Sequence, residues 1–281
     1  MNLRICPLRG GLGAEIIGYD FDRPPDRGDV QFLRNALIER HLLLFRGRTL
    51  DPARQVAFTL LFGDVLQTCS PRLRYIAEFP QIFRVSNRKE HGHLNIGRYW
   101  HSDGAYIEEP TAVTIHHIVV PTGDGDTLYT GLANAYERLA PAARASVSGM
   151  KTRAQTGVVH PLVKPHPVTG RIGLYVNLDP AAIIIDGNGQ ENGDMREFIG
   201  LHLSREGTFY RHRWREGDMV VVDNFAVAHH ATEVASAALR VLHRTSIHGP
   251  SVWWRTGHAA QVADGPAPGL SFLPVRLGGH D

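Results

Sequence analysis

The first eighty residues show two alternating patterns of apolar positions. Apolar residues recur every three to four positions over residues 30–40 and 52–62, which predicts two helices. Short apolar runs at 11–16 and 42–45 have the length of strands. We therefore expect an N-terminal cap of helices and strands, which occupies about residues 1–80.

From about residue 82 the pattern changes to short β-rich runs separated by turns rich in glycine and proline. The predicted strands are 82–85, 112–120, 173–177, 219–222 and 239–247, and helical inserts are predicted at 133–150 and 194–203. Many short strands with frequent turns are typical of a β-sandwich or jelly roll. The sequence therefore predicts a mainly β fold with flanking helices, whose jelly-roll core spans about residues 82–250.

The chain shows no internal repeat and no separate linker. Its 281 residues, 43% of them hydrophobic, suit one domain with a sizeable core. From Gly257 onward the sequence is rich in Gly, Pro and Ala, which indicates an irregular tail. We expect a single domain over residues 1–281.

Charge and cysteine content narrow the possible partners and locations. The formal charge is only +2, with 30 basic and 28 acidic residues, so no nucleic-acid partner is expected. Two cysteines cannot form a disulfide framework, and the first residues lack the apolar core of a signal peptide. No run approaches the roughly 18 apolar residues of a membrane span. These features predict a soluble, cytoplasmic protein.

A candidate metal site begins with the motif Trp-His-Ser-Asp at 100–103. In an extended segment, residues two apart point to the same face, so His101 and Asp103 can both face one ion. A further ligand, His229, follows the predicted strand 219–222, although the adjacent His230 is an alternative. Two imidazoles and one carboxylate leave positions open for a chelating co-substrate and dioxygen, as non-haem iron(II) oxygenases require. The competing interpretation is that a His-x-Asp triplet arises by chance in many proteins.

Two arginines share one face of the last predicted strand. Arg240 and Arg244 lie four residues apart, so in a strand their side chains point the same way. Burial of two guanidinium groups is costly without anionic partners, and a guanidinium matches the geometry of a carboxylate. The strand is therefore a candidate site for anionic ligands, unless it is an edge strand whose arginines face solvent.

In their order along the chain, these motifs resemble the taurine dioxygenase family, which includes the 2-oxoglutarate-dependent dioxygenases of taurine and 2,4-dichlorophenoxyacetate. The resemblance covers nearly the whole chain. The matching stretches are Leu-Gly-Ala-Glu-Ile-Ile-Gly at 12–18, Leu-Phe-Arg-Gly at 44–47, Trp-His-Ser-Asp at 100–103, Gly-Asp-Thr at 125–127, His-Pro-Val-Thr-Gly-Arg at 166–171, Tyr-Val-Asn at 175–177, Asp-Asn at 223–224, His229, Arg240 and His-Arg at 243–244.

The resemblance implies a double-stranded β-helix (a cupin-like jelly roll) and a role for several positions. The iron ligands of the family correspond to His101, Asp103 and His229. The residues that bind the co-substrate correspond to Arg240, which would bind the distal carboxylate of 2-oxoglutarate, and to Thr127, whose hydroxyl would assist it.

The resemblance also implies the reaction. The chain would be an Fe(II)- and 2-oxoglutarate-dependent dioxygenase that uses O2 and releases succinate and CO2. It would hydroxylate, desaturate or cleave a small acidic or amino-acid-like substrate. Arg244 matches a position near the acidic group of the substrate or the co-substrate, and Tyr99 and Tyr106 are further candidates for the substrate pocket, with core packing as the alternative. Relatives often form dimers or tetramers, so a homo-oligomer is also an option.

The sequence departs from the family at Phe225, where many relatives carry arginine, and the segment before Trp100 matches no substrate-binding pattern. Two other classes of function stay open. One is a cupin-type enzyme that uses another divalent metal without 2-oxoglutarate. The other is an inactive barrel that serves as a binding module. Production of succinate from 2-oxoglutarate distinguishes both from a dioxygenase.

Overall fold

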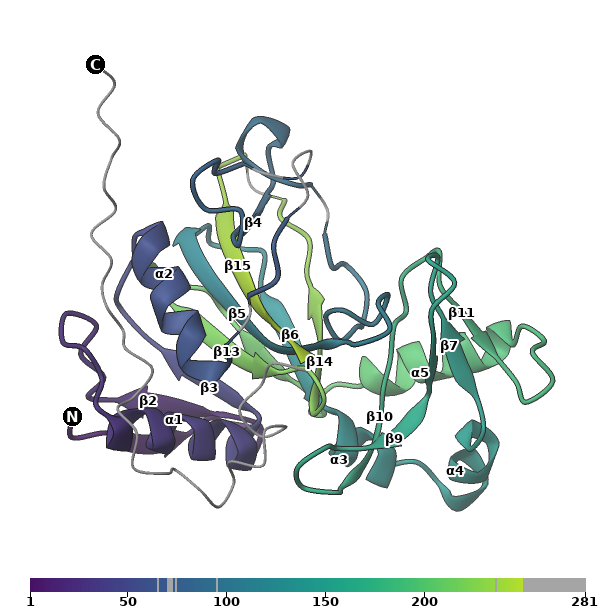
Figure 1. Cartoon of the computed structure of the whole chain (residues 1–281). Helices are drawn as coiled ribbons and strands as arrows, with labels where there is room; N and C mark the ends of the chain where they lie inside the picture. The colour runs from purple at the N-terminus through teal and green to yellow at the C-terminus, as the bar shows by residue number, and fades with distance from the viewer. Residues whose placement is uncertain (65, 70–72, 74, 95, 236, 250–281) are drawn as a thin grey trace.

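A large sheet forms the centre of the protein (Figure 1). The computed structural model describes residues 1–249 apart from 65, 70–72, 74, 95 and 236, so the predicted tail from Gly257 lies outside the described residues. Within this part of the chain the sheet has the order β1-β2-β3-β13-β5-β15-β4, and every neighbouring pair is antiparallel except β2 and β3. Its strands are β1 (Arg4–Pro7), β2 (Ala14–Ile17), β3 (Leu42–Phe45), β4 (Phe83–Ser86), β5 (Thr111–Val120), β13 (Met219–Asp223) and β15 (Val241–His248).

A smaller antiparallel sheet covers one face of the large sheet. It is formed by β12 (Tyr210–His212), β6 (Thr127–Gly131) and β14 (Val227–Ala231), in this order. Side chains from both sheets share one buried cluster, which includes Leu44, Val220 and Leu242 of the large sheet and Tyr129 and Val227 of the small one. Two antiparallel sheets that enclose a common core are the jelly-roll arrangement, so the predicted fold class is confirmed.

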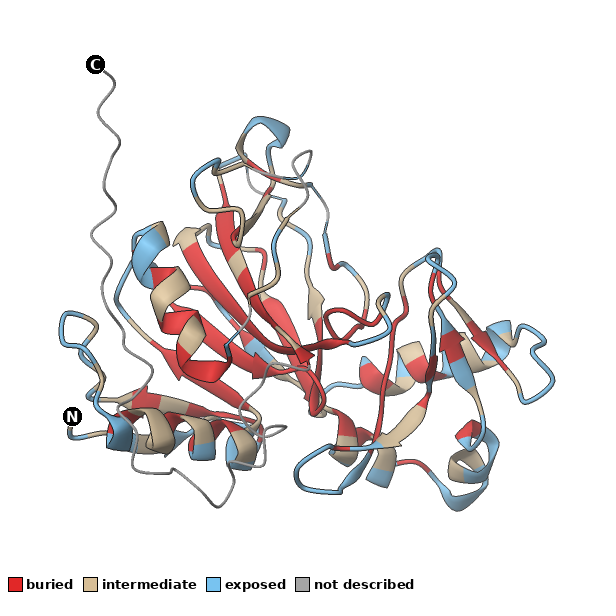
Figure 2. Ribbon diagram, viewed as in Figure 1, coloured by how far each residue is buried: buried red, intermediate tan, exposed pale blue. Residues whose placement is uncertain are grey.

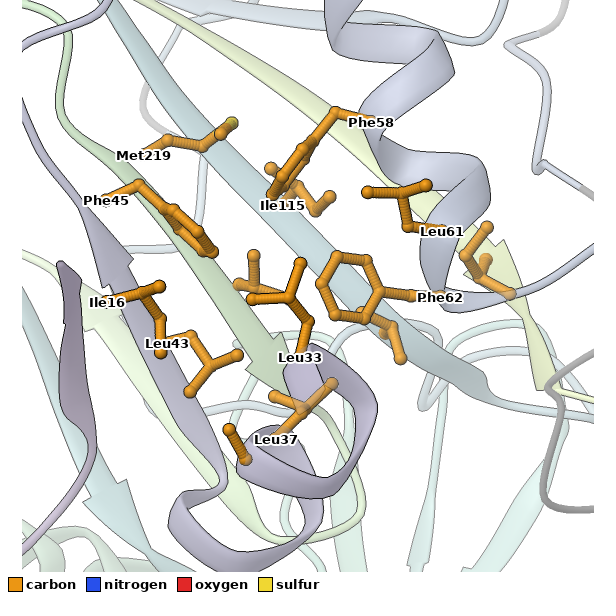
Figure 3. Packing of buried hydrophobic residues seen from close by; sticks show 14 of the residues in the cluster. Ile16, Leu33, Leu37, Leu43, Phe45, Phe58, Leu61, Phe62, Ile115 and Met219 are labelled. Carbon is orange, nitrogen blue, oxygen red and sulfur yellow. The ribbon is translucent and has the colours of Figure 1, made fainter. Parts of the chain in front are cut away.

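Helices cover the opposite face of the large sheet. They are α1 (Arg27–Arg40), α2 (Pro52–Thr59) and the short η1 (Leu60–Phe62). Figure 3 shows Leu33 and Leu37 of α1 and Phe58 of α2 packed against sheet residues such as Phe45 and Met219. Burial of each such side chain contributes about 1.5–3 kcal/mol.

Local sequence explains where these two helices begin. The side chain of Asp26 accepts the backbone N–H of Asp29, and the side chain of Asp29 accepts the backbone N–H of Asp26, which forms a capping box for α1. The side chain of Asp51 accepts the backbone N–H of Arg54 and so caps α2, and Pro52 occupies its first turn, where no backbone N–H is needed.

A third group of elements lies beside the two sheets, on the right in Figure 1. It contains α3 (Leu132–Glu137), α4 (Pro141–Val147), α5 (Gly193–Leu203), β7 (Lys151–Arg153), β8 (Val159–Pro161), β9 (Val163–Pro165), β10 (Ile172–Leu174) and β11 (Ile183–Ile185). Trp100 is buried in the hydrophobic cluster of this group, and its indole N–H donates to Ser204 Oγ at 2.8 Å. The candidate metal motif is thus anchored here at its first residue.

Several predicted elements differ from the structure. The helix predicted at 133–150 is two helices, because Pro141 has no N–H to continue the first one and instead starts α4. The run at 173–177 forms a strand only over Ile172–Leu174. The predictions missed β6 and β14, since both faces of these strands are mostly buried and their sequences do not alternate between apolar and polar residues. The short η3 (Lys89–His91) was also not predicted.

Burial is concentrated in the strands of the two facing sheets, as Figure 2 shows. Along β5 and β15, successive side chains point alternately to the helices and to the small sheet. The side chains of His117 and His243 are buried on the helix side, where Leu50 N donates to His117 Nε2 at 3.3 Å and Gln55 Oε1 lies 3.1 Å from His117 Nδ1. No helix in the described part of the chain is long and apolar enough to cross a membrane.

Buried neutral histidines predict a loss of stability at acidic pH. Burial lowers the pKa of His117 to about 4 and that of His243 to about 3, both from a usual value of 6.5. Between pH 6.5 and about 4 the unfolded chain therefore binds more protons than the folded one, so the free energy of unfolding falls as the pH falls through this window. Urea unfolding of the metal-free protein at several pH values measures this. A stability that is constant or rises toward acidic pH would contradict the prediction.

Candidate metal centre and co-substrate site

Two of the candidate ligands face each other across a pair of backbone hydrogen bonds. His101 N donates to His229 O at 3.1 Å, and His229 N donates to His101 O at 2.9 Å. Residues directly opposite in an antiparallel pair point to the same side, so the two rings lie with centroids 4.2 Å apart. Both histidines are buried.

Asp103 completes a group of three possible ligands. One nitrogen of His101, one nitrogen of His229 and one carboxylate oxygen of Asp103 all lie within 4.8 Å of one another. His101 Nδ1 lies 2.8 Å from the carbonyl oxygen of Tyr99, which can only accept, so Nδ1 carries the proton and Nε2 presents its lone pair to the group. This is the tautomer that a metal ligand requires.

A glycine makes the turn after Asp103 possible. Gly104 has φ +74°, and a Cβ there would lie 2.4 Å from the backbone nitrogen of Thr111. Any larger residue would therefore displace the backbone that follows the carboxylate.

Two side chains bind the carboxylate of Asp103, and a third supports them. Thr114 Oγ1 donates to Asp103 Oδ2 at 2.8 Å, and Arg244 Nη1 donates to Asp103 Oδ1 at 2.7 Å. Asn224 binds both Thr114 and Asp103. Its Nδ2 donates to Thr114 Oγ1 at 2.8 Å, and its Oδ1 accepts the backbone N–H of Asp103 at 3.2 Å. Ligand orientation is thus set by residues from β5, β15 and the end of β13.

The electrostatic environment gives the three groups the charge states that bind a cation. Burial raises the pKa of Asp103, but Arg244 and the nearby histidines outweigh this effect and hold the pKa below its usual value. Burial lowers the pKa of both His101 and His229. At neutral pH the group therefore offers two neutral imidazoles and one carboxylate.

Arg240 lies in the same space between the sheets. Its residue is only 6% exposed, and its Nε has no hydrogen-bond partner among the described residues. Burial lowers its pKa to about 10, and the largest opposing influence comes from Tyr129. Gly125, at φ +75°, leaves room for this side chain, since a Cβ there would lie 3.0 Å from Arg240 Nε. A buried guanidinium without a full set of acceptors suits an anionic ligand.

Thr127 is buried on β6, and its hydroxyl group can donate a hydrogen bond. Trp214 Nε1 donates to Thr127 Oγ1 at 3.0 Å, and an indole N–H can only donate. The hydroxyl proton of Thr127 is therefore available for a second oxygen, such as that of a bound carboxylate.

Arg244 connects the metal group to a cavity of about 130 Å³. Its guanidinium lies 4.6 Å from the centre of the Phe83 ring, and both residues line the cavity. The lining also includes Tyr106, which is 47% exposed. Tyr99 is not among the lining residues, and its ring packs 4.8 Å from that of His101. The predicted substrate contact of Tyr99 is therefore less well supported than that of Tyr106.

Two further histidines clarify the ligand assignment. The ring of His230 lies 5.6 Å from that of Trp100 and outside the group of three, as expected for the next residue of a strand. His116 lies inside the site, with Nε2 3.9 Å from Asp103 Oδ2, and the sequence analysis did not single it out. The sequence signal that could have found it is the alternation of side chains along β5, which places either His116 or His117 on the inner face.

A second group of possible ligands, His41, His166 and Asp223, is already occupied by hydrogen bonds. The backbone N–H groups of Val168 and Thr169 both donate to His166 Nδ1 at 3.1 Å. His166 Nε2 must then carry the proton, which it donates to Asp223 Oδ2 at 2.8 Å. No lone pair of His166 is left for a metal, so this group acts as a structural support at the end of β13.

The hydroxyl of Thr114 should be important for metal binding. Replacement Thr114→Val keeps the shape of the side chain but removes the donor to Asp103 and the acceptor of Asn224, so we expect the affinity for Mn²⁺ to fall about 10–100-fold. Titration of the metal-free protein with Mn²⁺ measures this. The control Thr114→Ser keeps the hydroxyl and should bind like the native chain, whereas equal affinity of the Val and Ser variants would refute the role of the hydroxyl.

Comparison with known proteins identifies the family of this chain. The sequence profile of the family described as "Taurine catabolism dioxygenase TauD, TfdA family" matches residues 4–246. The alpha-ketoglutarate-dependent sulfate ester dioxygenase of Pseudomonas putida is 24% identical over 283 residues, which cover 89% of this chain and 90% of the relative. The alpha-ketoglutarate-dependent 2,4-dichlorophenoxyacetate dioxygenase of Cupriavidus pinatubonensis is 26% identical and covers 88% of this chain and 98% of the relative.

A solved structure gives the same result. The crystal structure of a taurine dioxygenase from Burkholderia xenovorans superposes with a TM-score of 0.75 at 30% identity, and the match covers 89% of this chain and 90% of the other. Because the family profile spans most of the chain, the protein belongs to the TauD/TfdA family and is a 2-oxoglutarate-dependent dioxygenase.

Proposed function

We propose that the protein holds Fe(II) on His101, Asp103 and His229 and uses 2-oxoglutarate and O2 to oxidise a small acidic substrate. The observation that carries the proposal is the position of two features between the same two sheets. One is the buried group of three candidate ligands, and the other is the buried guanidinium of Arg240, whose Nε has no partner among the residues whose structure is described.

The ligand set fits a ferrous ion. Two neutral imidazoles and one carboxylate leave coordination positions open, which matches the requirement of non-haem iron oxygenases. When bound, the iron would activate O2 while the oxo-acid is converted to succinate and CO2 and the substrate is oxidised. Asp103 remains available as a ligand because Arg244 and Thr114 keep its carboxylate ionised and oriented.

Arg240 and Thr127 would bind the far carboxylate of 2-oxoglutarate. Charge-assisted hydrogen bonds of this kind contribute about 1.5–3 kcal/mol each. Arg240 is only 6% exposed, so an ion pair formed there would be little screened by solvent. With that end fixed, the keto-acid end would reach the metal in one orientation.

The cavity beside Arg244 is our candidate for the substrate site. A divalent cation and two guanidinium groups face a single carboxylate here, and an oxo-diacid together with an acidic substrate would neutralise the excess positive charge. Gln67 Nε2 and Gln81 Oε1, both of cavity-lining residues, are buried without a partner in the described part of the chain. Such amide atoms favour a polar substrate.

The relatives support a small anionic substrate. Those named above act on a sulfate ester and on 2,4-dichlorophenoxyacetate, which both carry an anionic group. We therefore place carboxylates, sulfonates, sulfate esters and amino acids first among candidate substrates, and propose hydroxylation, desaturation or cleavage as the outcome. Arg244 and Tyr106 would contact the substrate.

Succinate production tests the proposed function. The protein is incubated with Fe(II), 2-oxoglutarate and members of a panel of small organic acids in air, and succinate and CO2 are measured. We expect one substrate class to stimulate succinate release, and the release to require both the metal and 2-oxoglutarate. A protein that binds a divalent metal but neither binds nor consumes 2-oxoglutarate would instead be a cupin-type enzyme of another kind or a binding module.

Removal of the Arg240 guanidinium should weaken co-substrate binding specifically. For Arg240→Leu we expect the Kd of 2-oxoglutarate to rise about 10–100-fold, the equivalent of one strong charge-assisted contact, with Mn²⁺ affinity unchanged. Isothermal titration under anaerobic conditions measures both affinities.

A matched control separates this effect from a general loss of positive charge. Arg171, paired with Glu137 at the surface, can be replaced by Leu without an effect on 2-oxoglutarate binding. The metal-free Arg240→Leu protein should be at least as stable as the native chain, since it no longer buries a charge without a full set of partners. Native affinity for 2-oxoglutarate in Arg240→Leu would contradict the assignment.

A further inference from the structure

A third imidazole lies against the metal group but is not part of the three-ligand set. His116 is on β5 and is 5% exposed. It lies opposite Arg244 on β15 and opposite Val220 on β13, so its side chain shares the inner face of the sheet with these residues. None of the stretches that match the family contains this position.

The ring of His116 is held between the metal group and the small sheet. Its centroid lies 4.9 Å from that of His229, and its Nε2 lies 3.9 Å from Asp103 Oδ2. On the other side, His116 Nδ1 is 3.1 Å from the hydroxyl of Tyr129. One nitrogen therefore faces the ligands, and the other contacts a tyrosine of β6.

His116 Nε2 has no hydrogen-bond partner in the part of the chain that the structure describes. A distance of 3.9 Å to Asp103 Oδ2 is too long for a hydrogen bond, and that oxygen already accepts from Thr114. The nitrogen also falls outside the group whose ligand atoms lie within 4.8 Å of one another. It is thus placed to contact something bound at the metal, not the metal itself.

The surroundings of Tyr129 decide which nitrogen of His116 carries the proton. The guanidinium of Arg240, which can only donate, acts on the Tyr129 side chain through its charge, so the Tyr129 oxygen can serve as an acceptor on that side. The Tyr129 hydroxyl is then free to give its own proton to His116 Nδ1. In this arrangement Nε2 of His116 carries a hydrogen that points toward the metal group.

We propose that His116 donates this hydrogen to an oxygen of 2-oxoglutarate at its metal-bound end, a third contact beside Arg240 and Thr127. The inference rests on the proposed function and adds a residue to it. His116 adjoins Asp103 and His229 and contacts Tyr129, which shares one face of β6 with Thr127, so it lies between the metal group and a residue proposed for the far carboxylate. A carboxylate oxygen buried there without a donor would be unfavourable.

Binding measurements on four variants test the proposal without the need for turnover. Mn²⁺-loaded native protein is titrated anaerobically with 2-oxoglutarate and with its analogue N-oxalylglycine, and Mn²⁺ affinity is measured separately. His116→Leu removes the donor, His116→Gln carries an amide N–H near the position of Nε2, and the amide of His116→Asn ends short of it. The adjacent His117→Gln is the control, because His117 is buried on the other face of the same strand.

We expect His116→Leu and His116→Asn to bind both compounds at least about tenfold more weakly than the native protein, the loss expected for one hydrogen bond to a charged group. His116→Gln should remain within about threefold of native affinity, and Mn²⁺ affinity should change by less than about threefold in all variants, since His116 is not a ligand. His117→Gln should bind 2-oxoglutarate like the native chain.

The outcomes separate failure of the inference from failure of the proposed function. A native protein that binds Mn²⁺ but not 2-oxoglutarate would refute the function itself. If the native protein binds 2-oxoglutarate and the Leu and Asn variants bind it equally well, His116 makes no contact and the inference is wrong. A large loss of Mn²⁺ affinity in His116→Leu would also overturn it, because His116 would then be a ligand. Should the Leu variant fail to fold, equal affinities of the Gln and Asn variants have the same meaning.

Discussion

The pair of backbone hydrogen bonds between His101 and His229 is the constraint on which the site depends. It sets two distant segments in one register, and the same strand, β14, is paired with β6 so that His229 lies opposite Tyr129 and Ala231 lies opposite Thr127. Because side chains alternate along a strand, a slip by one residue would turn His229 away and bring His230 inward. The proposed metal ligands and the proposed co-substrate residues therefore share one space only in this register.

The interior of the jelly roll contains charged and polar side chains, and their charges are compensated to different degrees. Asp103 is surrounded by Arg244, Thr114 and three histidines, so its buried carboxylate is compensated. In the part of the chain that the structure describes, no carboxylate lies within hydrogen-bonding distance of Arg240, and its Nε has no partner. A core that contains such a cation is less stable than an apolar one, and the proposed anionic ligand would recover this stability on binding. The proposed role of Arg240 thus lowers the stability of the ligand-free protein, whereas the charge of Asp103 is compensated by its neighbours.

The fold class and the ligand motif could be predicted from the sequence, but much of the geometry could not. His101 and Asp103 stand out because their spacing is recognisable, and β5, β13 and β15 are apolar enough to indicate strands. The strands β6 and β14, which carry Thr127 and His229, lack that signal because their inward positions bear the polar groups of the site. Functional residues therefore obscure the pattern that reveals the strands on which they lie.

The supporting residues were the least predictable part of the site. Asn224 and Thr114 act through Asp103, and a contact between segments so far apart in the chain leaves no trace in local periodicity. His116 was missed because a pair of histidines in an apolar run indicates only that one of them faces inward. The extent of a single domain over all 281 residues, the homo-oligomer and the substrate contacts of Tyr99 and Tyr106 stay predictions.

A crystal structure of the protein with Mn²⁺ and N-oxalylglycine would test the central claim most directly. We predict one metal ion bound by His101, Asp103 and His229, with the analogue chelating it and the far carboxylate of the analogue paired with Arg240. A metal bound instead by His41, His166 and Asp223, or an analogue whose far carboxylate lies away from Arg240, would contradict the account.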